Sequence, residues 1–174
     1  MTDEKTENAG RSEENQRRFD IQKIYTKDLS FETPNSPVIF TQEWKPSVNL
    51  QLNNLHTIIA ENVHEVLLSM TVTAKLEDKT AYLVEVQQGG IFRIEGFEGQ
   101  ELEHMLAVYC PTVLFPYARE TISSLVGRGG FDPINLAPIN FDLIYARQKE
   151  EALAKQQQES NHCTHDQPAE FGTD

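Results

Sequence analysis

The fold is decided by residues 65–76, which read EVLLSMTVTAKL. Every second residue from Val66 onward is apolar, and the residues between them are polar apart from Leu67. Because successive side chains of a strand point to opposite faces, this period of two predicts a β-strand with one buried and one wet face. A polar turn at 77–79 separates it from the apolar run 81–88, so the two segments are expected to form an antiparallel hairpin.

Two more strands are predicted before this hairpin. Valine and leucine alternate with asparagine and glutamine over 48–52, and a longer alternation covers 19–32. The apolar face of that longer strand is expected to hold Phe19, Ile21, Tyr25, Leu29 and Phe31. Asp28 and Glu32 fall on the opposite, polar face, where Ile24 is the exception.

The second half of the chain changes to a helical pattern. From Glu101 onward the apolar residues recur at helical spacing, while Pro111 and Pro116 are expected to break or redirect the path. The segment 127–130, GRGG, is expected to end the helix, and a last helix is predicted to begin at Phe141 and to become polar toward Gln158. Strands followed by helices, without strand–helix alternation, predict an α+β fold with a four-stranded antiparallel sheet and helices packed on one face.

Composition sets the domain organisation. A chain of 174 residues that is 39% hydrophobic fits a single domain. Residues 1–18 and 150–174 hold few large apolar groups, so we expect a disordered N-terminal segment and a mobile, acidic C-terminal tail. The folded domain is predicted to span 19–149.

Charge and hydropathy argue against several classes of partner. The formal net charge of −12 disfavours nucleic acid and anionic membrane surfaces, both of which are bound by clustered lysine and arginine. The sequence has no signal-peptide core near its start and no run of about 18 apolar residues, so we expect a cytoplasmic protein without membrane insertion. Cys110 and Cys163 lie in an apolar segment and a polar tail, and a disulfide is not expected.

Motifs for chemistry are weak. Cys110 could act as a nucleophile with His104, but a spacing of six residues places them on different helix faces, which favours a buried structural thiol. The glycines of 127–130 lack the lysine and hydroxyl residue of a phosphate-binding loop. The tail cluster 162–165, HCTH, has metal-ligand residue types but too few for a closed site. We therefore predict no catalytic residue, cofactor or metal.

Three blocks of sequence carry a family resemblance. Residues 24–35 read IYTKDLSFETPN, and residues 84–92 read VEVQQGGIF. The third block contains YCP at 109–111, LFPYARE at 114–120 and NLAPINF at 135–141. Together they resemble SecB, the bacterial export chaperone family, over about residues 19–141.

The resemblance implies an ATP-independent chaperone. Members of the family bind unfolded secretory precursor proteins, keep them competent for translocation and deliver them to the motor ATPase SecA. They are homotetramers arranged as dimers of dimers. An acidic face of the sheet docks SecA, and the matching positions in this chain are Asp28, Glu32, Leu83 and Glu85.

A chaperone for unrelated chains needs adaptable apolar grooves lined by aromatic and methionine side chains. Large apolar residues ordinarily belong to the core, but as a group the candidates for unfolded-polypeptide binding are Phe31, Phe40, Trp44, Phe92 and Met105. The alternative is a holdase, toxin-control or ligand-binding protein that has the SecB fold without the export role. Such a protein has no need for Asp28, Glu32 and Glu85 together.

Overall fold

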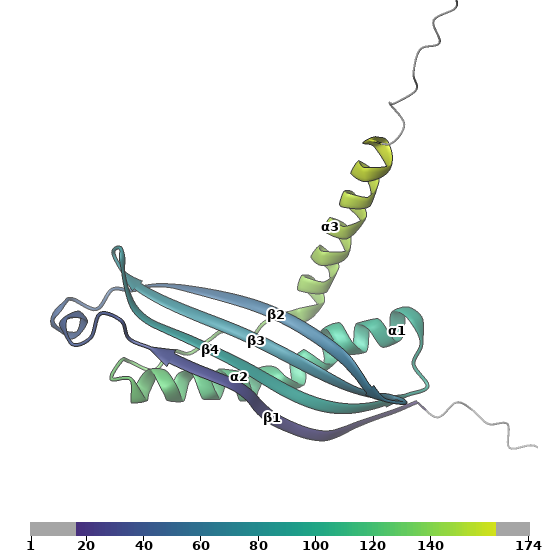
Figure 1. Cartoon of the computed structure of the whole chain (residues 1–174), viewed down its shortest axis with the longest axis horizontal. Helices are drawn as coiled ribbons and strands as arrows, with labels where there is room; N and C mark the ends of the chain where they lie inside the picture. Colours follow the sequence, from purple (N-terminus) through teal and green to yellow (C-terminus); the bar gives the residue numbers. More distant parts are fainter. Residues whose placement is uncertain (1–16, 163–174) are drawn as a thin grey trace, which may run out of the picture.

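The computed structural model describes residues 17–162, with side chains as far as residue 155. One antiparallel sheet has the strand order β1-β4-β3-β2. Its strands are β1 (Arg18–Glu32), β2 (Ser47–Ala60), β3 (Val63–Leu76) and β4 (Lys79–Glu95). The helical elements are η1 (Val38–Thr41), α1 (Gly99–His104), the π-helical η2 (Met105–Tyr109), α2 (Cys110–Arg128) and α3 (Phe141–His162). Figure 1 shows α2 lying along one side of the sheet and α3 projecting away from it, which confirms the predicted α+β class.

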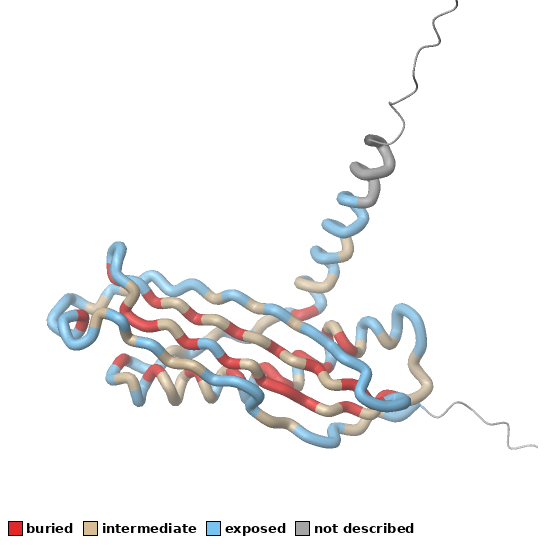
Figure 2. Tube along the Cα trace, in the orientation of Figure 1, coloured by how far each residue is buried: buried red, intermediate tan, exposed pale blue. Residues whose placement is uncertain are grey.

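The hydrophobic core lies between α2 and the two central strands. We call the side of the sheet that α2 covers the helix face and the other side the open face. On β3 and β4 the even-numbered residues are buried on the helix face, and the odd-numbered ones are mostly part-exposed on the open face (Figure 2). This is the alternation predicted from residues 65–76. The edge strands β1 and β2 are more exposed, because α2 packs on β3 and β4.

Gly90 allows α2 to approach the sheet closely. A Cβ atom at this position would lie 2.5 Å from the ring of Phe92 and 2.9 Å from Leu114 of α2. Any larger residue at position 90 would displace the side chains of Phe92 and Leu114 from their packed positions. The second glycine of the pair, Gly89, faces the open side and has a different role.

Strand β1 departs from simple alternation at two bulges. Its register with β4 shifts between Ile21 and Lys23, and again between Thr26 and Asp28. Each bulge adds one residue and so reverses the face that the following side chains occupy. The first bulge reverses the predicted phase and the second restores it.

Two predicted positions are therefore wrong. Ile24, expected on the polar face, pairs with Gly90 and lies on the helix face against the core. Tyr25, expected on the apolar face with Phe31, pairs with Gly89 and lies on the open face. A bulge shifts the phase of the alternation by one residue, and its trace in this sequence is Ile24, the apolar exception on the predicted polar face.

Strand β2 is longer than predicted. The prediction ended near residue 52, but β2 pairs with β3 as far as Ala60. The second half places Asn54 and His56 at helix-face positions and Leu55 on the open face. This reverses the polarity of the first half, so the sequence pattern stops before the strand does.

The helical segment runs without interruption through both prolines. Pro111 lies in the first turn of α2 and Pro116 inside it, so neither ends the helix. The Cys110 N–H donates to the carbonyl of Met105, five residues back, which sets the π register of η2. In that register the partner of the Leu106 carbonyl would be residue 111, a proline without an N–H.

The Leu106 carbonyl is instead satisfied from the sheet. Asn54 Nδ2 donates a hydrogen bond to it over 3.1 Å. Asn54 lies on the helix face of β2, so this bond joins the edge strand to the π turn. The C-terminal end of α2 lies where it was predicted, because the helix stops at Arg128 and Gly130 adopts a φ of +86°.

Helix α3 begins at Phe141, as predicted, and extends beyond the expected domain boundary. It continues to His162, so the first part of the tail expected to be mobile is helical here. His104 Nε2 and Asp142 Oδ1, 2.8 Å apart, tie its first turn to α1. The described helices include none with the length and apolarity needed to cross a membrane.

Candidate polypeptide-binding surfaces

The four residues expected to dock a partner lie together on the open face. This acidic patch comprises Asp28, Glu32, Leu83 and Glu85. Glu32 lies opposite Leu83 in the β1–β4 register, and Ser30, opposite Glu85, separates Glu32 from Asp28 on the same face. The three carboxylates are exposed and form no ion pair with any described residue. The acidic patch is therefore an exposed, negatively charged surface that contains one apolar residue, Leu83.

A fourth carboxylate of the open face, Glu65, is neutralised. Lys27 Nζ lies 2.8 Å from Glu65 Oε1, and the hydroxyl of Tyr25 donates to the same oxygen. These two hydrogen bonds hold the pKa of Glu65 below its usual value. Burial and the adjacent carboxylate raise the pKa of Tyr25 to about 12. The acidic patch therefore ends before Glu65.

Three of the residues expected to bind unfolded chains meet in one aromatic cluster. Its members are Phe31, Phe40, Trp44, Tyr82 and Phe131. The ring of Phe131 is central, with ring centres 4.9 Å from Phe40, 5.2 Å from Trp44 and 5.0 Å from Tyr82. Phe40 is 49% exposed, whereas Tyr82 and Phe131 are buried. The cluster therefore has a buried base and an accessible rim.

The sequence did not single out Tyr82 and Phe131. Tyr82 belongs to the run predicted as an ordinary strand, and Phe131 follows the glycines that end α2. The one available signal was the aromatic residue directly after that helix stop, since Gly129 allows a close approach there. A Cβ at Gly129 would lie 2.2 Å from the ring of Phe31. The loop after α2 thus packs directly on the aromatic cluster.

The other two candidates lie elsewhere. Phe92 is fully buried, with its ring beside Phe19 at the far end of β4. Met105 is part-buried in η2 and lines a shallow depression with Phe97 and His104. Neither residue shares a surface with the aromatic cluster in this conformation.

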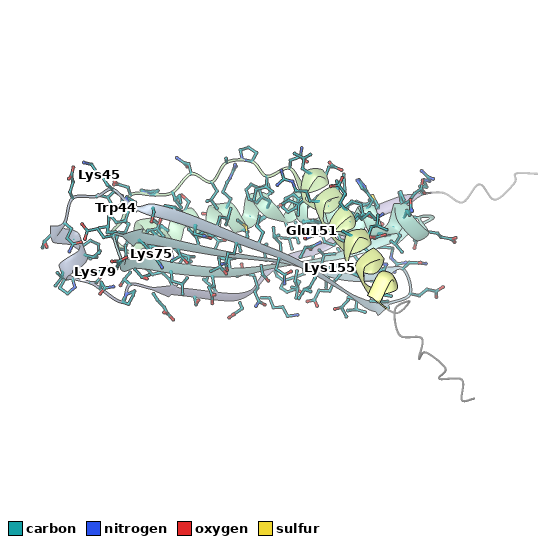
Figure 3. The ribbon with its side chains drawn as sticks, turned by 90° about the horizontal axis from the view of Figure 1, so that it is seen from above. Trp44, Lys45, Lys75, Lys79, Glu151 and Lys155 are labelled. Atoms are coloured by element: carbon teal, nitrogen blue, oxygen red, sulfur yellow. The ribbon has the colours of Figure 1, made fainter. Side chains whose placement is uncertain are left out.

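The helix face of β2 is incompletely covered between the aromatic cluster and α3. Its apolar residues Val48, Leu50 and Leu52 remain part-exposed, with Val48 at 46%, and we call this strip the β2 groove. Farther along, a cavity of about 290 Å³ lies between β2 and α3, where its walls include Leu52, Ile144 and Tyr145. In Figure 3, Trp44 lies at one end of the molecule, far from Glu151 and Lys155 on α3. Apolar surface therefore extends from the aromatic cluster toward α3.

The candidate nucleophile is shielded. Cys110 is completely buried, and burial raises the pKa of its thiol to about 12, so it is protonated at neutral pH. His104 is paired with Asp142 rather than with the thiol. Among residues 17–155 no group of three metal-ligating side chains comes together, and the cluster at 162–165 lies outside the described side chains.

An exposed acidic sheet face and an incompletely covered aromatic groove define a polypeptide-binding protein of α+β class. Comparison with known families gives a specific assignment. The family model described as preprotein translocase subunit SecB matches residues 12–152. The chain therefore belongs to the SecB family.

Similar proteins agree with this assignment. The protein-export protein SecB of Marinobacter nauticus is 54% identical over 158 residues, covering 88% of this chain and 96% of the relative. The protein-export protein SecB of Nitrosococcus oceani is also 54% identical, with 93% and 100% covered. A solved Mycobacterium tuberculosis SecB-like chaperone, in complex with a ChAD peptide from the HigA1 antitoxin, matches with a TM-score of 0.58 at 19% identity. It covers 71% of this chain and 88% of the other, and at this identity it supports the fold alone.

Proposed function

We propose that this protein is a cytoplasmic, ATP-independent chaperone that binds unfolded secretory precursors and delivers them to the motor ATPase SecA. The observation that carries the proposal is the pairing of an apolar groove with a separate acidic face on one sheet. Two surfaces allow a client and a motor to be bound at the same time. The named relatives are protein-export proteins, which supports the same role.

Client binding is assigned to the aromatic cluster and the groove along β2. Unfolded chains expose aliphatic and aromatic side chains that folded proteins bury. Burying one large apolar side chain of a client contributes about 1.5–3 kcal/mol, so several contacts along an extended groove give useful affinity without shape specificity. Phe31, Phe40 and Trp44 are the proposed contacts at the cluster. Phe92 and Met105 would support binding only indirectly or after rearrangement.

SecA docking is assigned to the acidic patch. Exposed carboxylates attract a basic partner and accelerate encounter. Because exposed charges contribute little to stability, Asp28→Lys is expected to weaken SecA binding and leave folding nearly unchanged. Measuring affinity at low and high salt separates this electrostatic contribution from apolar contacts.

A homotetramer, a dimer of dimers, is the proposed assembly. Apolar side chains remain exposed on the helix side of β1 and on the adjacent helix, where Ile21 is 47%, Tyr109 48% and Tyr117 50% exposed. Surfaces of this kind usually mark subunit contacts. Light scattering should give four times the 19.8 kDa chain mass, and a monomer at micromolar concentration would contradict the assembly.

The decisive test of the export role is a refolding assay. A signal-bearing precursor diluted from denaturant should refold more slowly with this protein present, and SecA should form a ternary complex with the pair. If refolding is slowed but SecA neither binds nor changes release, the alternative applies, a holdase or toxin-control protein without the export role. If refolding is unaffected, the chaperone assignment itself fails.

A further inference from the structure

A row of apolar residues crosses the open face beside the acidic patch. Leu55 of β2 pairs with Leu67 of β3, Leu67 pairs with Gly89 of β4, and Gly89 pairs with Tyr25 of β1. We call these four residues the apolar row. Residues directly opposite one another in neighbouring strands point to the same face, so the row forms a continuous strip over all four strands.

The row is accessible and has a fixed shape. Leu55 is 55% exposed, and Leu67 and Tyr25 are part-exposed. The Tyr25 ring lies over Gly89, since a Cβ there would be 2.6 Å from its Cζ atom. Its hydroxyl donates to Glu65, which holds the ring flat on the sheet.

The row borders the acidic patch directly. One register row separates it from Glu85, and that row consists of Asn53, Ser69, Gln87 and Asp28. Adjacent same-face positions of a strand are about 7 Å apart, so apolar and acidic side chains lie within reach of one short extended segment. A segment that runs along the strands would place alternate side chains over successive rows.

We infer that the apolar row is the second half of the SecA-docking surface, and that it binds an extended segment with a large apolar residue about two to six positions from basic residues. This inference rests on the proposed function and deepens it. Charge alone gives an encounter that salt screens, whereas burial of apolar side chains gives affinity that salt does not remove. The partner segment therefore has two chemically different ends.

Charge complementarity selects this occupant over a second copy of the chain. A symmetric contact through the open face would bring the acidic patches of the two copies close together, and like charges oppose such a contact. A basic segment is attracted by the carboxylates of the patch, and the charge of Lys27 beside the row does not oppose it, because Lys27 is already paired with Glu65.

The test compares variants of the full chain in SecA binding at about 0.05 M and about 0.5 M salt. Leu55→Thr with Leu67→Thr should weaken binding about five- to tenfold at both salt concentrations, because the lost contact is apolar. If the double variant folds poorly, Leu55→Thr alone replaces it. This substitution is at an exposed site and should cause a smaller loss of SecA affinity. Asp28→Lys should weaken binding mainly at low salt. Leu143→Thr is the matched control, since it changes a leucine of similar exposure, 57% against 55% for Leu55, that lies on α3 and outside the sheet.

Two peptides of about 12 residues add an independent readout. Both carry the same lysines, and one carries leucines where the other carries serines. The leucine peptide should compete with SecA more strongly, and the double threonine variant should abolish that difference.

Other outcomes overturn the inference. If the double variant binds SecA like the wild type while Asp28→Lys does not, docking is purely electrostatic and the proposed function stands. If neither variant affects SecA binding, the proposed docking role fails as well. If the double variant instead loses unfolded precursor or changes its mass in light scattering, the row contacts clients or another copy of the chain.

Discussion

The ring of Tyr25 occupies the space that a side chain at residue 89 would need. A Cβ built on Gly89 lies 2.6 Å from Tyr25 Cζ, closer than two carbon atoms can approach. The neighbouring Gly90 meets Phe92 and Leu114 in the same way on the opposite face. The glycine pair therefore serves both sides of the sheet: one glycine admits α2 and the other shapes the open face.

Gly89→Ala is expected to destabilise the fold by about 1–3 kcal/mol, because the new methyl group displaces the Tyr25 ring. Urea denaturation measures the change. Gly127→Ala is the control, since its Cβ would meet Pro133 at an ordinary 3.5 Å and helical alanine is favoured over glycine. In a Tyr25→Ser background the cost of Gly89→Ala should largely disappear. An equal cost in both backgrounds would mean that the ring is not the obstacle.

Asn54→Ala should destabilise the protein by about 1–2 kcal/mol, because the Leu106 carbonyl of the π turn loses its donor. The neighbouring Asn53→Ala, on the open face, should have little effect on denaturation. Equal stability of the two variants would show that water replaces the side chain at no cost.

Tyr25 predicts a specific loss of stability in alkaline solution. Its pKa is raised to about 12 in the folded protein, whereas the unfolded chain titrates near 10. Below pH 10 both states keep the proton and the contribution is fully present. Between pH 10 and 12 the unfolded state releases the proton first, so stability falls as the pH rises.

Tyr25→Phe isolates this effect from other alkaline groups. The stability difference between the wild type and this variant should shift in favour of the variant as the pH rises through that window. A difference that stays constant from pH 9 to about pH 11 would contradict a part-buried, carboxylate-paired hydroxyl.

Trp44 is the single tryptophan of the chain, so its fluorescence reports on the aromatic cluster. A tryptophan-free unfolded client should shift its emission to shorter wavelength as the ring becomes less exposed to water. Phe40→Ala should weaken client affinity about tenfold, since a half-exposed ring at the rim of the cluster loses its contact. Ile59→Ala, equally exposed at the other end of the sheet, is the control.

The sequence predicts the central sheet well and its edges less well. Residues 65–76 alternate with the single exception of Leu67, because one face of this strand is covered by α2, so burial dictates every second residue. Strand β1 has two bulges and β2 lies partly uncovered, so composition there is not tied to a buried face. The last helix is predicted correctly from its start at Phe141, where it meets the core, to its polar part toward Gln158.

The candidate surfaces were likewise predictable only where a regular strand places their residues. The positions of the acidic patch could be predicted, since Asp28, Ser30 and Glu32 share a face after both bulges. The aromatic cluster could be predicted only in part, because Phe131 reaches Trp44 through a loop whose path depends on Gly129. The apolar row is not predictable from the sequence, because alternation places Tyr25 on the wrong face and ends β2 before Leu55.

The most direct test of the account is a titration of one precursor protein in its unfolded and folded forms at low and high salt. A chaperone that binds through the aromatic cluster and the β2 groove should bind the unfolded form and retain most of that affinity at high salt, while the folded form stays unbound. Phe40→Ala should reduce that binding and Asp28→Lys should not. Equal binding of the folded form, or loss of precursor binding at moderate salt, would contradict an apolar groove and indicate an electrostatic adaptor instead.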